Sequence, residues 1–259
     1  AAEDTLLEYH FEQFNHTTDD MVAWIHVTDS FTSGADLEIY MYYGNGGASD
    51  AQDEPATYPA NYTAVYHLEE PSGTEGADST ENYDLTHNNT PTLGVAGKIH
   101  LGIGYTKASE ESSTNGTLLD GGITQASMTM WVMQTDTWDS DSTPGEAILH
   151  KQNTAADRDF ISTQWRTNGK IILRCIDGSD RQVDIETAKV SWTGGVWYHL
   201  TFVFDATNNF TKIYVNGSIT DGGTTSTTLY AMAAGTYGNF QLGSYVEAAM
   251  YSNTRLDEV

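Results

Sequence analysis

The acidic stretch "DTWDSDSTPGE" at residues 136–146 holds the side chains whose types and spacing first point to chemistry. It contains three carboxylates that could bind a cation: Asp136, Asp139 and Asp141. Carboxylate oxygens are ligands that calcium prefers, but an EF-hand loop would need glycine at Pro144 and glutamate at His150. An EF-hand is therefore excluded.

The same stretch could bind a sugar. Trp138 stands among the three aspartates, and an exposed indole beside hydrogen-bonding carboxylates can stack on the apolar face of a sugar. We therefore predict ligand binding by Trp138 and its acidic neighbours. A solvated acidic loop without a ligand is the alternative, and the residues alone do not decide between the two.

A second pair of acids lies in "QVDIETAKV", residues 182–190. In a strand, Asp184 and Glu186 would face the same side, as the two carboxylates of a glycosidase must. The next alternating position is Ala188, and no other strand-like run has a triplet of acids. This pattern favours solvated charges at the edge of a sheet over catalysis.

Single histidines and the cysteine give weaker signals. His199 has no second metal ligand at a suitable spacing, which favours a core histidine bonded to the backbone. Cys175 alternates with apolar residues, as expected of an inert thiol facing a core. The run "YHLEEP" offers three potential ligands but indicates the end of a strand: His67, Glu69 and Glu70. Phosphate-binding loops, zinc motifs and nucleophile elbows are absent from the sequence.

Charge is the strongest global feature. The 259 residues include 36 acidic and 11 basic ones, which give a formal net charge of -25 at pH 7. Such a surface repels phosphate backbones and anionic lipids, so we expect no nucleic-acid partner. No apolar run approaches the ~18 residues that span a bilayer, so we expect no membrane insertion.

Apolar residues recur with a period of two along most of the chain, which predicts an all-β fold. Many short strands separated by turn residues are typical of a sandwich or jelly roll. The polar stretch at residues 45–61 predicts a linker, and we place the domains at 1–57 and 58–259. Expected strands include "MVAWIHV", "LEIYMYY", "TAVYHL", "ASMTMWVMQ", "KIILRCI", "WYHLTFVF" and "TKIYVNG".

The stretch "GGVWYHLTFVFDATNNFTKIYVNGSI", residues 194–219, predicts a central hairpin. Both faces of its first strand are largely apolar, and an Asn-Gly turn signal follows the second strand. We expect eight side chains of the fold to be mostly buried: Trp131, Leu149, Ile172, Trp197, Leu200, Phe202, Ile213 and Val215.

This hairpin resembles the central hairpin of laminin G-like jelly-roll domains in the concanavalin A-like lectin and glucanase superfamily. The stretches "AVYHLEE", "GADSTENYDLTHN", "GKIHLGIGY", "SMTMWVM", "AILHK" and "RLDEV" resemble further parts of that fold in the same order. Residues 1–57 resemble the second half of a small uncharacterised β module that often precedes such jelly rolls in microbial surface proteins. The resemblance implies a two-sheet antiparallel jelly roll with a smaller N-terminal β module.

The resemblance also implies a structural calcium ion in some members, where the first loop meets the last strand. It places Asp78 of "GADST" and Asp257 of "RLDEV" in those neighbourhoods. Backbone carbonyls would have to complete the six to eight oxygens that calcium needs. A pair of unrelated surface acids is the alternative.

Six Asn-x-Ser/Thr sequons predict an exported, glycosylated protein. They begin at Asn15, Asn61, Asn88, Asn115, Asn209 and Asn216.

The residues and the resemblance together predict a non-catalytic, lectin-like recognition or adhesion module that binds glycans or surface glycoproteins. We expect it on an extracellular surface protein or a virion fibre. A structural subunit of a surface or virion filament, without sugar binding, is the alternative, and a glycan-cleaving enzyme is less favoured because the acids are missing.

Both ends of the chain predict open strand edges. "LLEYHFEQF" is expected to be a strand without an earlier partner, and "RLDEV" the start of a final strand. Exposed edges invite pairing with other strands, which predicts that further sequence or neighbouring subunits of a larger assembly supply the missing strands. A shortened chain without such an assembly is the alternative.

Overall fold

The computed structural model describes residues 6–15, 17–18, 20–28, 33–34, 36–121, 123–142, 144–153, 160–176, 182–225, 228–231, 237–245 and 249–259. The chain forms two compact units, residues 1–63 and 64–259, where the sequence placed the division after residue 57. None of the helices in the described ranges is long and apolar enough to cross a membrane.

The first unit contains an antiparallel pair of strands, β1 (Tyr9–Asn15) and β2 (Asp20–Ile25). The later strand β2 pairs with one edge of β1, and the expectation that β1 has no earlier partner in the chain stays a prediction. Within the expected linker, residues Glu54–Thr57 form one helical turn, α1, since Asp53 caps its backbone and proline starts it. The expected strand at residues 37–43 has no regular structure, and its apolar side chains are exposed.

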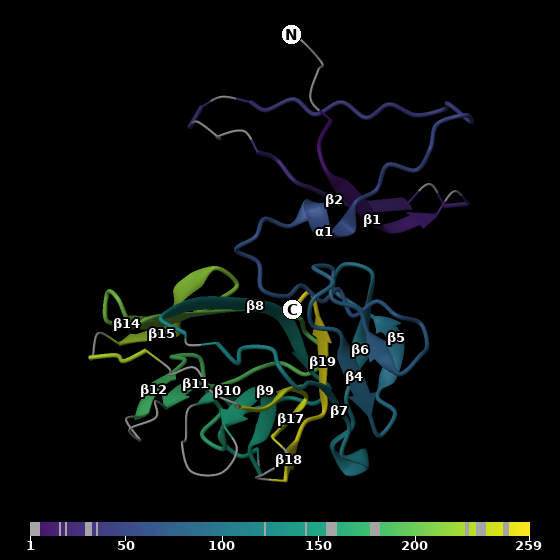
Figure 1. Cartoon of the computed structure of the whole chain (residues 1–259). Helices are drawn as coiled ribbons and strands as arrows, with labels where there is room; N and C mark the ends of the chain where they lie inside the picture. Colours follow the sequence, from purple (N-terminus) through teal and green to yellow (C-terminus); the bar gives the residue numbers. More distant parts are fainter. Residues whose placement is uncertain are drawn as a thin grey trace. The chain divides into compact units, whose positions relative to one another are not determined.

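The second unit is an antiparallel sandwich of two sheets, which confirms the predicted fold class (Figure 1). The larger sheet contains eight strands in the described residues. Their spatial order is β12 (Gln182–Glu186), β11 (Ile171–Ile176), β10 (Phe160–Trp165), β9 (Glu146–Asn153), β16 (Tyr237–Leu242), β7 (Ser112–Asn115), β4 (Leu85–Asn88) and β3 (Glu75–Gly76).

The smaller sheet contains seven strands in the same described part. Their order is β15 (Ser218–Thr225), β14 (Phe210–Val215), β13 (Tyr198–Asp205), β8 (Gln125–Gln134), β19 (Thr254–Asp257), β6 (Leu101–Gly104) and β5 (Thr92–Ala96). A short hairpin, β17 (Ser244–Tyr245) with β18 (Met250–Tyr251), and the 3₁₀ turn Lys107–Ser109 complete the unit.

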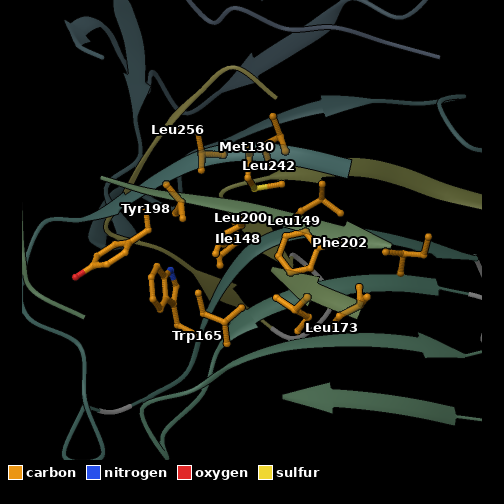
Figure 2. Packing of buried hydrophobic residues seen from close by; sticks show 14 of the residues in the cluster. Met130, Ile148, Leu149, Trp165, Leu173, Tyr198, Leu200, Phe202, Leu242 and Leu256 are labelled. Atoms are coloured by element: carbon orange, nitrogen blue, oxygen red, sulfur yellow. The ribbon is translucent and has the colours of Figure 1, made fainter. Parts of the chain in front are cut away.

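The hydrophobic core lies between the two sheets (Figure 2). Leu200 and Phe202 of β13 point toward Leu149 and Leu173 of the larger sheet. Along β13 every second side chain, from Tyr198 to Phe204, is buried, because successive residues in a strand face opposite sides. The predicted hairpin is therefore confirmed, and it occupies a central place in the smaller sheet.

Six of the eight side chains predicted to be buried are buried: Leu149, Ile172, Leu200, Phe202, Ile213 and Val215. Trp131 and Trp197 are only half-buried. Trp131 lies opposite His199 on the outer face of the smaller sheet, and the two rings meet edge to face at 5.1 Å. His199 is thus a half-buried surface residue and not the expected core histidine. Its backbone N–H donates to Asn216 Oδ1.

The end of the chain also differs from expectation. "RLDEV" contains most of β19, which pairs with β8 on one side and β6 on the other. Beyond it, Val259 exchanges two backbone hydrogen bonds with Tyr66, at 2.7 and 2.9 Å. This strand is central, not an open edge, because the chain returns to the middle of the smaller sheet.

Candidate ligand-binding face

The acidic stretch after β8 does not present its tryptophan to a ligand. Trp138 is 6 % exposed, and its ring lies 6.1 Å from that of Trp165 in the core. Its indole N–H donates to the Arg166 carbonyl at 2.9 Å, and its backbone pairs with that of Trp192. The predicted exposed stacking surface is therefore wrong, because pairing with Trp192 turns the indole inward.

The three aspartates of this stretch lie in different surroundings. Asp136 and Asp141 are exposed, whereas Asp139 is half-buried. Asp139 Oδ1 accepts the Asp141 N–H at 2.9 Å and closes a tight turn with Ser142. Ligand binding by these carboxylates stays a prediction, now without the indole that was to accompany them.

The larger sheet carries a different feature, a row of polar residues across its outer face. Strand pairing places one residue from each of the eight described strands in the same register. We call this set the polar row, and its members from edge to edge are Asp184, Arg174, Ser162, His150, Gln241, Thr114, Thr86 and Glu75. Neighbouring strands are about 4.8 Å apart, so the polar groups follow one another closely.

The next register position faces the opposite side of the sheet. It brings Leu173, Thr163, Leu149 and Leu242 together, and the three leucines belong to the core. Because successive side chains alternate between faces, the polar row must lie on the outer face, away from the smaller sheet.

The middle of the polar row is buried beneath the β17–β18 hairpin, which lies beside β9 on the side away from β8 (Figure 1). The Tyr245 ring stacks on His150 with centroids 3.7 Å apart. Ser244 donates to Gln241 Oε1 at 3.0 Å, and Gln164 donates to Ser162 at 2.7 Å. Burial lowers the pKa of His150 to about 3, so its imidazole is neutral at ordinary pH.

The β11–β12 end of the polar row is partly exposed. The Arg174 guanidinium donates two hydrogen bonds to the Asp184 carboxylate, at 2.7 and 2.6 Å. The hydrogen bonds that Arg174 donates to Asp184 raise the pKa of Arg174, and Gln182 donates a further bond to the same carboxylate. Glu186 contacts the Lys170 ammonium at 3.2 Å. Both acids considered for catalysis are therefore bound to cations.

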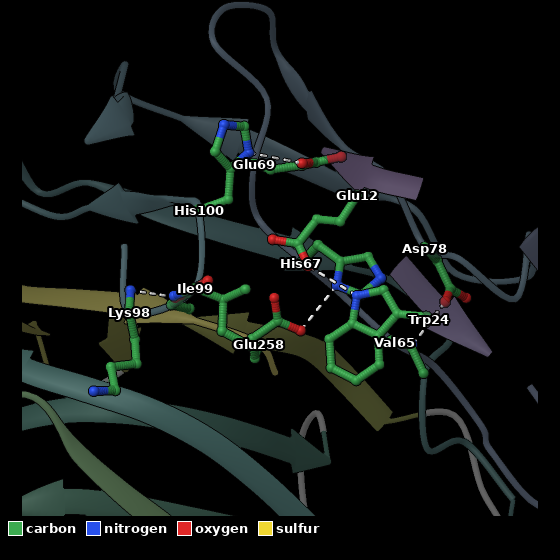
Figure 3. A network of polar contacts seen from close by, with 11 residues as sticks. Glu12, Trp24, Val65, His67, Glu69, Asp78, Lys98, Ile99, His100 and Glu258 are labelled. Carbon is green, nitrogen blue, oxygen red and sulfur yellow. Dashed lines mark hydrogen bonds and ion pairs between the residues drawn. The ribbon is translucent and has the colours of Figure 1, made fainter. Parts of the chain in front are cut away.

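The calcium expected at Asp78 does not fit the donors around that residue (Figure 3). Its two oxygens accept five hydrogen bonds, from the backbone of Val65, Thr80, Asn82 and Tyr83 and from the Thr80 hydroxyl. A carboxylate has about four lone-pair positions, so little capacity remains for an ion.

Asp257 also binds backbone. Its Oδ2 accepts the N–H groups of Lys98 and Ile99. In the described part of the chain, neither Asp78 nor Asp257 joins a group of three or more potential metal ligands. Calcium at these two residues remains an untested prediction that the local geometry does not favour.

The run that includes His67 makes polar side-chain contacts within the second unit (Figure 3). His67 contacts Glu258 at 2.8 Å, and Glu69 contacts His100 at 3.2 Å. Glu70 accepts the Ala77 N–H at 2.6 Å. These contacts connect the segment before β3 to the end of the chain beyond β19 and to the β5–β6 turn. The three side chains therefore have structural partners.

The sequon asparagines divide into two groups. Asn61, Asn209 and Asn216 are exposed, whereas Asn15, Asn88 and Asn115 are half-buried. The amide nitrogens of Asn88 and Asn115 already donate to backbone carbonyls, which a glycan on that nitrogen would disturb. Glycosylation stays a prediction, and the three exposed sites suit it best.

Sequence reasoning missed the polar row. The available signal was a lone polar residue inside an apolar strand: His150 in "AILHK", Arg174 in "KIILRCI" and Ser162 beside Ile161. That signal marks an outward-facing position but does not reveal which strands lie side by side.

Several solved structures are similar in fold. The binding domain of Paraclostridial Mosquitocidal Protein 1 is 15 % identical with a TM-score of 0.57, over 75 % of this chain and 47 % of that one. The binding domain of Botulinum Neurotoxin DC, in complex with SialylT, is 9 % identical with a TM-score of 0.50, over 75 % and 45 %. Trypanosoma rangeli sialidase is 10 % identical with a TM-score of 0.50, over 75 % and 29 %. The chain thus spans less than half of each relative.

No curated protein matches the chain. Residues 1–84 match a domain of unknown function, DUF2341, in agreement with the resemblance of the N-terminal residues to an uncharacterised module. Residues 104–259 match the model of the concanavalin A-like lectin/glucanases superfamily. This match covers more than half of the chain and agrees with the two-sheet sandwich, so the protein belongs to the concanavalin A-like lectin/glucanase superfamily.

Proposed function

We propose that the protein is a non-catalytic recognition module that binds glycans through the outer face of its larger sheet. The observation that carries this proposal is the polar row, in which eight strands each contribute a hydrogen-bonding side chain. The guanidinium and carboxylate at one end of the row and the hydroxyl and carboxylate at the other are at least partly exposed and match the hydroxyls of a sugar, whereas Ser162, His150 and Gln241 in the middle are buried.

Two observations support a non-catalytic role. A glycosidase needs one carboxylic acid that donates a proton and a second carboxylate nearby, whereas Asp184 and Glu186 are each held by a cation. The serine–histidine contact between Ser113 and His87, 2.7 Å long, lies in the protein interior with Ser113 fully buried. A substrate has no access to that hydroxyl.

An extracellular or virion-surface location fits the same proposal. Binding of external glycans requires exposure outside the cell, and the strongly acidic surface stays soluble through its own charge. The relatives described as binding domains, and one of them in complex with SialylT, support carbohydrate recognition in general.

A glycan array followed by titration calorimetry tests the proposal. We expect the protein to bind at least one glycan, and Arg174→Met to weaken that binding at least tenfold. Lys212→Met is the control, because it removes a cation from β14 in the smaller sheet. Absence of glycan binding, or equal losses in both variants, would refute the proposal. Self-association without glycan binding would instead favour a structural subunit.

A further inference from the structure

The polar row contains a feature that bears on which glycans it can accept. Of its eight residues, Arg174 is the one cation, and its guanidinium fork is occupied by Asp184 through two parallel hydrogen bonds of 2.7 and 2.6 Å. An arginine fork is the group that proteins use most effectively to bind carboxylates. Here an internal carboxylate takes the place that an acidic sugar would need.

The remaining members of the polar row supply no positive charge. His150 is kept neutral by burial, and Ser162, Gln241, Thr114 and Thr86 are uncharged. Glu75 and Asp184 are acidic. Beside the row, the Lys170 ammonium contacts Glu186 at 3.2 Å. The charges of the two ion pairs therefore cancel, and the remaining charge of the row is negative.

The charge of the whole chain acts in the same direction. A formal net charge of -25 repels anionic ligands over distances of about 8–10 Å at physiological salt. A carboxylated or sulfated sugar would have to overcome this repulsion and also displace Asp184 from Arg174. A neutral sugar faces neither obstacle, because its hydroxyls can hydrogen-bond to the ion pair without breaking it.

We propose that the partly exposed β11–β12 end of the polar row recognises neutral glycans, and that Asp184 determines this specificity by occupying the guanidinium of Arg174. The inference rests on the proposed glycan-binding function and adds the chemical class of the ligand. Gln182 contributes by donating a 2.6 Å hydrogen bond to Asp184, which holds the carboxylate in place.

The test uses the full chain and glycans in matched pairs that differ by one carboxylated sugar, such as lactose with sialyllactose. We expect the wild-type protein to bind the neutral member at least tenfold more tightly. In Asp184→Asn the guanidinium loses its charged partner, so the preference should fall to threefold or less. Asp221→Asn is the control, since it removes the same charge from an exposed aspartate of β15 in the smaller sheet and should leave the preference unchanged.

The outcomes separate this inference from the proposed function. Equal or tighter binding of the carboxylated member by the wild-type protein would overturn neutral-glycan specificity while leaving glycan binding intact. An unchanged preference in Asp184→Asn, with circular dichroism showing a folded variant, would overturn the role of Asp184. If the protein binds no glycan in any of the pairs, the proposed function itself is overturned.

Discussion

The backbone N–H of Tyr83 donates a 3.0 Å hydrogen bond to Oδ2 of Asp78. With the other donors to this carboxylate, the contact holds the loop between β3 and β4 closed and fastens it to Val65. The side chain is 3 % exposed, so its charge is stabilised by these donors and not by water. The loop is thus organised around a carboxylate, as other loops are organised around an ion.

Replacement of Asp78 by asparagine should destabilise the protein by about 3 kcal/mol, because charge-assisted hydrogen bonds are lost and an amide N–H₂ is directed at backbone donors. Urea unfolding measures the change. Glu81→Gln is the control, since Glu81 lies exposed in the same loop.

Calcium provides a second measurement on this loop. The melting temperature should be the same with calcium and with a chelator, because the Asp78 oxygens already accept five hydrogen bonds. A rise in melting temperature on adding calcium would show that an ion binds after all. Equal stability of Asp78→Asn and the wild type would contradict the role of the carboxylate.

His150 predicts a loss of stability in mild acid. Its pKa is lowered by burial to about 3, against about 6.5 in an unfolded chain. Below pH 6.5 the unfolded state therefore binds a proton that the folded state does not. The contribution of His150 to the free energy of unfolding therefore keeps its full value above pH 6.5. It falls by up to about 1.4 kcal/mol per pH unit as the pH drops from 6.5 toward 3.

The variant His150→Phe tests this prediction because it keeps a ring against Tyr245 and cannot be protonated. Denaturant unfolding between pH 7 and pH 5 should show a smaller slope in the variant than in the wild type. Part of the slope should persist, because burial also lowers the pKa of His87 and of His199. An identical slope in both proteins would count against a buried, neutral His150.

Alanine in place of Gly243 should cause a steric clash, and alanine in place of Gly217 is the control for the backbone strain alone. Both Gly243 and Gly217 have φ of +75°. A Cβ at Gly243 would lie 2.5 Å from Cγ of the Tyr105 ring, whereas one at Gly217 would meet no atom within 4 Å. Gly217→Ala should therefore cost about 1–2 kcal/mol for the backbone alone.

Gly243→Ala should cost at least about 2 kcal/mol more than Gly217→Ala, because the Tyr105 ring is packed in the core and must move. Thermal or urea unfolding of the two variants gives the difference. Similar losses of stability in both would mean that the ring moves aside freely.

Cys175 should be unreactive in the folded protein. Its thiol is buried, and burial raises its pKa to about 12, so almost no thiolate forms at neutral pH. A thiol reagent such as iodoacetamide should label the protein in 6 M guanidinium chloride but not in buffer. Rapid labelling in buffer would contradict the burial.

The predictable part of the fold came from local patterns. Side chains along "YHLTFVF" alternate between core and outer face, as the period of two requires. Asn216 and Gly217 both have positive φ and form the turn that their sequence predicts. Cys175 lies in the core with the apolar residues that alternate with it. Each of these outcomes depends on residues close together in the chain.

Whether a given tryptophan is buried depended on residues that are distant in the sequence. Trp138 was expected to be exposed because acidic residues surround it in the sequence, yet pairing with Trp192 places it in the core. Trp131 and Trp197 were expected to be buried, yet both are only half-buried, and Trp131 lies on the outer face of the smaller sheet opposite His199. Composition does not specify which face of a sandwich is covered.

Residue types and their spacing were enough to predict an acidic, all-β chain built from alternating strands of a concanavalin A-like sandwich. The row that joins Arg174 to Asp184 and Ser162, and through the next strand to His150, became known from the folded arrangement of the strands. The reason is register: shifting any strand by one residue would turn its polar side chain into the core, and register is chosen by backbone pairing and core packing between segments far apart in the chain.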